Sequence, residues 1–196
     1  EALYLNLSCA RARGEGVLLR GQPIHYNYLL YPLLIAPLSA LPPQVDLYRA
    51  IEVFNALSIS AALFPAYAVA RRITGSRRAA LLVALLTALM PDMLMARHVM
   101  VESVSYPMIL IAVYLALKMY GRPRTGQAVA CALVCALLYT LKPGYIALGA
   151  VCLAGLVWRG ASGRNKPRLA QACAFALTLA AALAAYHLFL TYGLKI

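Results

Sequence analysis

The fold is decided by residues 92–102, which read DMLMARHVMVE. They lie between two apolar runs that are each about long enough to cross a bilayer, since a spanning helix needs roughly 20 apolar residues. The stretch holds Asp92, Arg97, His98 and Glu102, and ionisable groups at membrane depth are costly enough to suggest a function. The alternative is a polar turn at the water interface, because loops next to membrane segments are commonly polar.

The composition of the whole chain favours an all-α integral membrane protein. Of the 196 residues, 63% are hydrophobic and 12% are charged, whereas a soluble domain is about half apolar and a quarter charged. One soluble core cannot bury so much apolar surface, and helices satisfy their own backbone groups in lipid. We therefore expect a polytopic transmembrane helical bundle.

The charge balance is strongly basic, with 18 Lys and Arg against 6 Asp and Glu and a net charge of +12. Most basic residues fall in short breaks between apolar runs, which is the topology signal of membrane proteins. We therefore expect anionic lipids as partners and no nucleic acid. Four of the five cysteines lie inside apolar runs, where a thiol behaves as a small hydrophobe, so neither disulfides nor cysteine metal ligands are expected.

Two regions are expected along the chain. Residues 1–46 are predicted to form an extracytoplasmic loop with interfacial helices, because they are too charged and too rich in proline for a spanning helix. Within this loop, residues 31–41 are predicted to form a short helix that dips into the bilayer. Residues 47–196 are predicted to form the transmembrane core. Because the chain opens at Glu1 without an initiator Met, we interpret it as a fragment of a larger membrane domain.

Apolar runs in the core are expected to form helices at 47–70, 79–95, 103–118, 127–141, 145–158 and 169–190. If these helices alternate in direction, the turns at 71–78, 118–126 and 159–168 share one face. They hold eleven of the 18 basic residues and no acidic residue. By the positive-inside rule that face is cytoplasmic, so the opposite, active face lies outside the plasma (inner) membrane.

The outward face would present a mixture of charged and imidazole side chains: Glu1, Arg20, His25, Asp46, Arg97, His98, Glu102 and Lys142. Cations can hold a phosphate or pyrophosphate, and a carboxylate can act as general base on an acceptor hydroxyl. Together these groups suit the transfer of a group from a lipid-linked phosphate, with the lipid tail held by the apolar helices.

Structural interpretations stand beside this functional one. Lys142 can simply reach the interface with its long side chain, and Arg97 and Glu102, five residues apart, can pair with each other. His25, among tyrosines, can be an interfacial anchor. Asp46 is expected near the start of the next helix, where a carboxylate suits the helix dipole.

Several short motifs follow one another in a recognisable order: Glu-Ala-Leu-Tyr at 1–4, Gly-Glu-Gly at 14–16, Tyr-Pro-Leu-Leu-Ile-Ala-Pro-Leu at 31–38, Arg-Arg-Ile-Thr-Gly-Ser-Arg-Arg-Ala-Ala at 71–80, the Arg97 to Glu102 stretch, and Leu-Lys-Pro at 141–143. This order resembles the membrane domain of the GT-C glycosyltransferases, a group that includes the protein O-mannosyltransferases and the aminoarabinose transferases. The likeness extends over nearly the whole chain.

The resemblance implies an enzyme that moves a sugar from a polyprenyl-phosphate donor to an acceptor on the extracytoplasmic face; the acceptor can be a lipid, a glycan or a protein. It implies that Glu1 is the base, or helps to hold a divalent metal, and that Glu102 orients Arg97 or contributes to a metal site. It further implies that Arg97 and Lys142 neutralise the donor phosphate, with His98 and His25 in supporting roles.

The alternative is a transporter or flippase subunit for a lipid-linked sugar, with no bond chemistry. Inverted repeats would favour that alternative, and none is visible in the helix pattern or the motif order.

Overall fold

The computed structural model describes residues 2–14, 18–19, 22–23, 28–42, 44–90, 96–122, 124–162 and 166–193. This described part is helical apart from one antiparallel pair of two-residue strands. The expectation of an all-helical chain is therefore confirmed.

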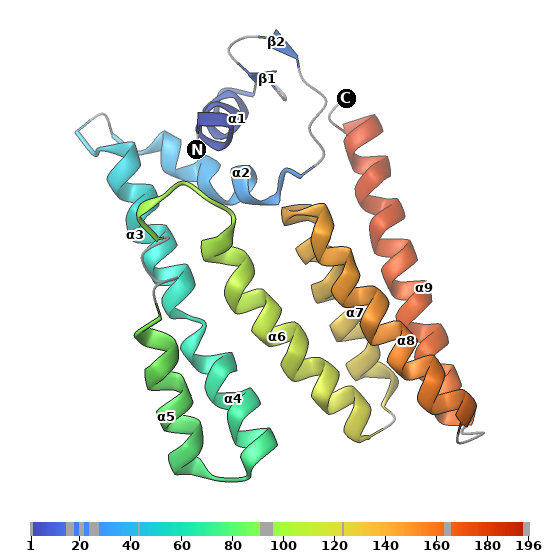
Figure 1. The fold of residues 1–196 in the computed structure, drawn as a ribbon. Helices are drawn as coiled ribbons and strands as arrows, with labels where there is room; N and C mark the ends of the chain where they lie inside the picture. Colours follow the sequence, from blue (N-terminus) through green and yellow to red (C-terminus); the bar gives the residue numbers. More distant parts are fainter. Residues whose placement is uncertain are drawn as a thin grey trace.

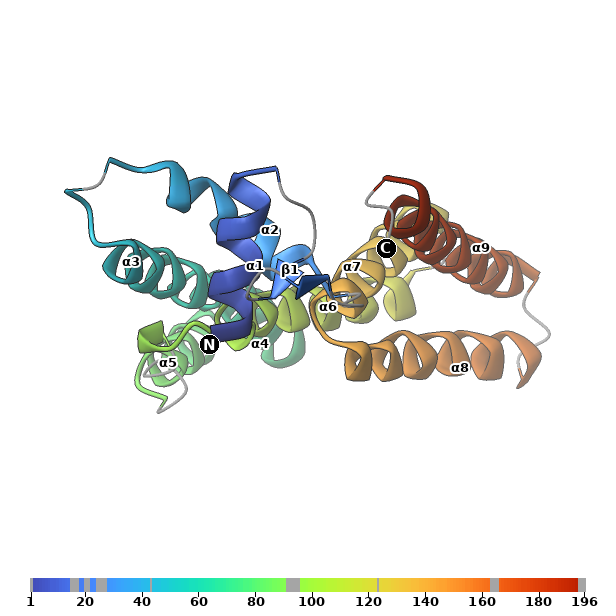
Figure 2. The same cartoon turned by 90° about the horizontal axis from the view of Figure 1, so that it is seen from above.

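The described residues among the first forty lie across one end of a bundle of longer helices (Figures 1 and 2). They form α1 (Ala2–Ala12), the strands β1 (Leu18–Leu19) and β2 (Gln22–Pro23), α2 (Leu30–Ile35) and the 3-10 helix η1 (Ala36–Ala40). Gly14, just after α1, has a φ of 74°, a left-handed conformation in which a helix readily ends. The short helix predicted over residues 31–41 is thus present as α2 and η1.

The bundle itself runs from residue 47 to residue 193. Its elements are α3 (Leu47–Ser60), α4 (Leu63–Thr74), α5 (Arg77–Ala88), α6 (Glu102–Gly121), α7 (Thr125–Leu141), the 3-10 helix η3 (Pro143–Tyr145), α8 (Ile146–Ser162), α9 (Lys166–Leu188) and the π-helix η4 (Phe189–Gly193). Among the described residues, four segments are long and apolar enough to cross a membrane: Leu47–Thr74, Glu102–Gly121, Pro143–Ser162 and Pro167–Tyr192. These segments support the membrane class.

Two predicted helices have different bounds in the structure. The run expected over 47–70 is divided between α3 and α4, with a break at residues 61–62. Pro65, in the first turn of α4, lacks the N–H that would bond to residue 61, and its ring crowds that carbonyl. The run expected over 79–95 is a helix only as far as Ala88, and residues 91–95 lie outside the described part.

The helices pack through small side chains. The buried cluster among α6, α7, α8 and α9 consists of Ala116, Met119, Ala128, Cys131, Ala132, Cys135, Cys152, Leu156, Ala172 and Phe175. Alanine and cysteine let helices approach closely, as is usual in lipid. Large apolar side chains point outward instead: Phe64, Leu89, Trp158 and Leu177 are all more than 70% exposed. An exposed apolar surface of this kind is typical of helices that face hydrocarbon chains.

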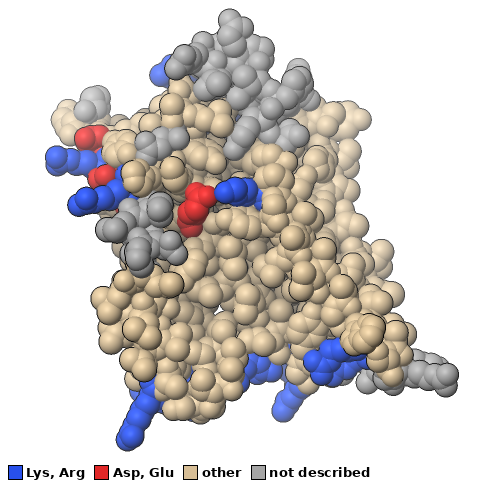
Figure 3. Space-filling model, in the orientation of Figure 1, with Lys and Arg blue, Asp and Glu red and all other residues tan. Residues whose placement is uncertain are grey.

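The basic turns gather at one end of the bundle. The facing ends of α4 and α5, of α6 and α7, and of α8 and α9 all lie at the end away from α1 and α2 (Figure 1). On the face drawn in Figure 3, the charged side chains visible at that end are all basic, and all visible acidic side chains lie in the other half. The predicted separation of charge between the two ends is therefore present, and the groups around Glu102 and Lys142 lie near α1 and α2.

Candidate functional site

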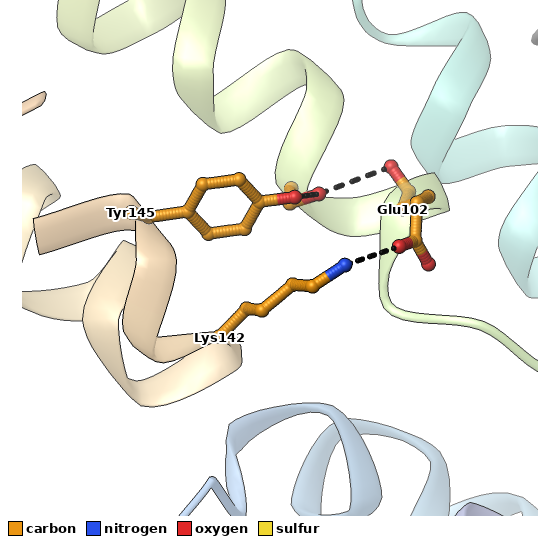
Figure 4. A network of polar contacts seen from close by, with 4 residues as sticks. Glu102, Lys142 and Tyr145 are labelled. Atoms are coloured by element: carbon orange, nitrogen blue, oxygen red, sulfur yellow. Dashed lines mark hydrogen bonds and ion pairs between the residues drawn. The ribbon is translucent and has the colours of Figure 1, made fainter. Parts of the chain in front are cut away.

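An ion pair joins the start of α6 to the end of α7. Lys142 Nζ lies 3.1 Å from Glu102 Oε1, and the two side chains are 54% and 40% exposed (Figure 4). Glu102 is the first residue of α6, and Lys142 directly follows α7. Each charge therefore lies at the helix end whose dipole favours it. The hydrogen bond and the charge of Glu102 hold the pKa of Lys142 above its ordinary value, so Lys142 is a cation at neutral pH.

A second contact fixes the same two segments beside the ion pair. The Tyr145 hydroxyl, from η3, lies 2.9 Å from Ser105 Oγ on α6. Ser105 Oγ in turn donates to the Glu102 carbonyl oxygen at 3.4 Å (Figure 4). Because η3 follows Lys142 directly, this contact holds the loop that carries the cation against the helix that carries the carboxylate.

A pocket of about 370 Å³ lies beside these polar groups. It is lined by Ile59, Met100, Glu102, Ser105, Tyr106, Ile109 and Tyr145. Glu102, Ser105 and Tyr145 bring polar groups to a lining that is otherwise apolar or aromatic. A pocket with a few convergent polar groups in an apolar wall is the usual form of a small-molecule site. This one suits a molecule with a polar head and a hydrocarbon tail.

The segment that carries Arg97 and His98 is held by its backbone. The Tyr48 hydroxyl donates to the Arg97 carbonyl oxygen at 3.1 Å, and Asn55 Nδ2 donates to the His98 carbonyl oxygen at 2.9 Å. Both the Arg97 and the His98 side chains are exposed. Neither lines the pocket, and Glu102 pairs with Lys142 in place of Arg97. The structure thus brings together Glu102 and Lys142 but not Arg97 or His98.

Two other predicted site residues, Glu1 and His25, lie outside the described residues. Asp46 begins α3, where its Oδ1 accepts from the Tyr48 backbone N–H at 2.9 Å, as expected of a residue at a helix start. Within the described part of the chain, no group of three or more His, Cys, Asp or Glu side chains could hold a metal ion.

Sequence reasoning missed the buried polar residues that support the site. Asn55 is 0% exposed, and its Oδ1 accepts from the Tyr31 hydroxyl at 3.0 Å. Burial raises the pKa of Tyr31 to about 12, so the hydroxyl stays protonated and can donate. Asn55 is a polar group at membrane depth in a mainly apolar run, and this is the signal that points to it from sequence.

Comparisons with protein-family models, curated proteins and solved structures give no match for this chain. No relative therefore indicates a function, and the resemblance to the GT-C glycosyltransferases stays an expectation.

Proposed function

We propose that this chain is the membrane core of a transferase that moves a sugar from a polyprenyl-phosphate donor to an acceptor, with GT-C-like architecture. The observation that carries the proposal is the Glu102–Lys142 ion pair, 3.1 Å long, of which Glu102 lines a mainly apolar pocket. A lipid-linked sugar phosphate is an anionic head on a hydrocarbon tail. The ion pair offers a cation for the head, and the pocket offers apolar walls for the tail.

The proposed chemistry gives the two charged residues different roles. The acceptor hydroxyl oxygen attacks the anomeric carbon, the bond from that carbon to the phosphate oxygen breaks, and polyprenyl phosphate leaves. Glu102 takes the hydroxyl proton as general base. Lys142 stabilises the negative charge on the departing phosphate. Glu102 lines the pocket, and the side chains of Glu102 and Lys142 are both partly exposed, so two substrates can reach them.

The remaining predicted residues are proposed to contact the substrates outside the pocket. Arg97 and His98 are exposed next to α6 and are proposed to meet the donor as it approaches, with Glu1 and His25 as further members of the outer face. A divalent metal is not needed by the step as written. The membrane is proposed to be the plasma membrane, with the α1–α2 end outside and the basic turns in the cytoplasm, in keeping with the positive-inside rule.

The direct test is sugar transfer in proteoliposomes that contain radiolabelled polyprenyl-phosphate sugars and a mixture of candidate acceptors. We expect Glu102→Gln and Lys142→Met each to lower the rate by about a hundredfold or more, the usual loss when a general base or charge stabiliser is removed. Glu52→Gln is the matched control, because Glu52 lies on α3 and does not line the pocket. Unchanged transfer in both site variants would remove these residues from the mechanism.

The same preparation separates the transferase from a flippase. A flippase moves the labelled lipid between leaflets and leaves the sugar–phosphate bond intact, whereas a transferase releases polyprenyl phosphate. Product formation that depends on Glu102 supports the transferase. Translocation without any new glycosidic bond would contradict the transferase and support the transport function instead.

A further inference from the structure

A second pocket lies at the opposite end of the bundle, where the basic turns gather (Figures 1 and 3). It has a volume of about 360 Å³ and is lined by Arg72, Lys118, Gly121, Arg122, Arg124 and Gln127. These residues come from the end of α4, the end of α6 and the start of α7. The proposed transferase site uses none of them.

The lining contains four cations and no acid. The acidic residues that the structure describes, Asp46, Glu52 and Glu102, are all outside this pocket. Four like charges around one hollow repel each other, and a bound anion is the simplest way to offset that repulsion. The four side chains also supply N–H donors, which is the chemistry that recognises phosphate.

Two of the cations are held in place before any ligand binds. Arg72 Nη2 donates to the Leu117 carbonyl oxygen at 3.3 Å, and it lies where a Cβ on Gly121 would be only 2.6 Å away. The glycine therefore makes room for the guanidinium. Lys118 Nζ lies 5.2 Å from the centre of the Tyr114 ring, a cation–π contact that orients the ammonium.

The start of α7 adds a further attraction for an anion. This 17-residue helix begins at Thr125 with no side-chain cap and no acid in its first turn, so its backbone N–H groups and dipole favour a negative charge there. Gln127 Oε1 is buried and has no hydrogen-bond partner among the described residues. It is an acceptor that a hydroxyl group on the ligand can satisfy.

We propose that this basic pocket binds the phosphate headgroup of an anionic membrane lipid that also carries hydroxyl groups, such as phosphatidylglycerol. The pocket lies at the ends of helices whose apolar side chains face outward, so a lipid can place its phosphate in the pocket and its chains along the bundle. Basic pockets between helix ends on one membrane face are common lipid sites. The proposal does not depend on the transferase, because the two pockets are at opposite ends.

The test is native mass spectrometry of the purified chain, titrated with phosphatidylglycerol in a zwitterionic detergent. We expect the double variant Arg122→Gln and Arg124→Gln to weaken lipid binding by about tenfold or more. Each basic residue near an anionic lipid headgroup adds favourable free energy to lipid binding. The matched control is Arg77→Gln with Arg78→Gln, which removes two exposed charges at the same end but outside the pocket. That control is expected to bind as the unmodified chain does.

Two further measurements make the test specific. Gln127→Leu is expected to weaken binding of phosphatidylglycerol and not of phosphatidic acid, which lacks the headgroup hydroxyls. Inorganic phosphate at millimolar concentration is expected not to displace the lipid. Equal losses in the two double variants would show a general charge effect and overturn the pocket, and displacement by phosphate would show that the occupant is a soluble anion.

Discussion

Asn55 and His98 are joined by a hydrogen bond in which Asn55 Nδ2 donates to the His98 carbonyl oxygen over 2.9 Å. The other end of the same amide accepts from the Tyr31 hydroxyl at 3.0 Å. One buried side chain on α3 therefore ties α2 to the backbone that leads into α6. Because Glu102 is the first residue of α6, Asn55 positions the proposed base without lining its pocket.

Replacement of Asn55 by Leu tests this positioning role. The substitution leaves the Tyr31 hydroxyl without its acceptor, and a buried orphan group costs about 1–3 kcal/mol. It also removes one of two hydrogen bonds to the His98 carbonyl oxygen, which still accepts from the Met100 N–H at 2.9 Å. We expect a lower thermal unfolding midpoint in detergent and slower sugar transfer. Ser60→Ala, at an exposed position near the end of α3, is the control. An Asn55→Leu protein with normal stability and normal transfer would show that the hydrogen bonds of Asn55 are dispensable.

Much of the helical arrangement follows from the sequence. Apolar runs and basic turns predicted the bundle and the two-ended distribution of charge, because lipid and positive-inside topology act on composition alone. Asp46 was predicted at a helix start from its residue type and its place before an apolar run, and it accepts the Tyr48 N–H there.

The candidate site was only partly predictable, because it depends on contacts between distant residues. Glu102 and Lys142 are 40 residues apart, and their pairing needs α6 and α7 to lie side by side. Local spacing suggested Arg97 as the partner of Glu102, and this interpretation is wrong. The buried residue Asn55 was not predicted, because its run also holds Arg49, Glu52, Ser58 and Ser60, and local spacing does not show which of these polar residues is buried.

The Glu102–Lys142 pair is expected to matter more for activity than for stability. Ion pairs as exposed as this one contribute about 0.2–1 kcal/mol, so a double-mutant cycle with Glu102→Gln and Lys142→Met is expected to give a coupling in that range. Because the pKa of Lys142 is raised, the coupling is expected to be unchanged between pH 7 and 9 and to be lost only as the pH rises through that raised pKa. A coupling of several kcal/mol would indicate a structural role.

The pocket that Glu102 lines can be filled by a substitution that leaves both Glu102 and Lys142 unchanged. Ile109 lines it on α6, and Ile109→Trp is expected to occupy space meant for the donor's hydrocarbon tail. We expect KM for the polyprenyl donor to rise about tenfold while kcat changes little, the pattern of lost ground-state binding. Ile111→Trp adds the same bulk at an exposed position of α6 outside the lining and is expected to leave KM unchanged. Equal effects at both positions would argue against tail binding in this pocket.

Close packing of α8 against Tyr120 gives a prediction about the bundle alone. The Tyr120 hydroxyl donates to the Cys152 carbonyl oxygen at 2.8 Å, and a Cβ on Gly155 would clash with the same hydroxyl. Gly155→Ala is therefore expected to displace Tyr120 and to cost about 1–3 kcal/mol, as overpacking usually does. Gly126→Ala, where a Cβ meets nothing within 4 Å, is the control. Equal unfolding midpoints for the two variants would contradict this packing.

Alkaline pH is expected to lower the free energy of unfolding, because Tyr31 is fully buried in the folded chain. Its pKa is about 12 in the folded chain and about 10 when unfolded. The folded state therefore favours the protonated phenol. The resulting stabilisation is fully present below about pH 10 and is lost as the pH rises through about 12, to a total of about 3 kcal/mol at most.

Unfolding midpoints of the unmodified chain and of Tyr31→Phe, measured from pH 8 to pH 12, test this pH dependence. At pH 8 the variant is expected to be less stable by about 1 kcal/mol, because Asn55 loses a donor. Above pH 10 the difference is expected to shrink and then reverse, since only the tyrosine must ionise. Tyr192→Phe removes a phenol that is 76% exposed and is expected to leave the alkaline profile unchanged. Parallel profiles for Tyr31→Phe and the unmodified chain would show that Tyr31 titrates as an ordinary exposed phenol.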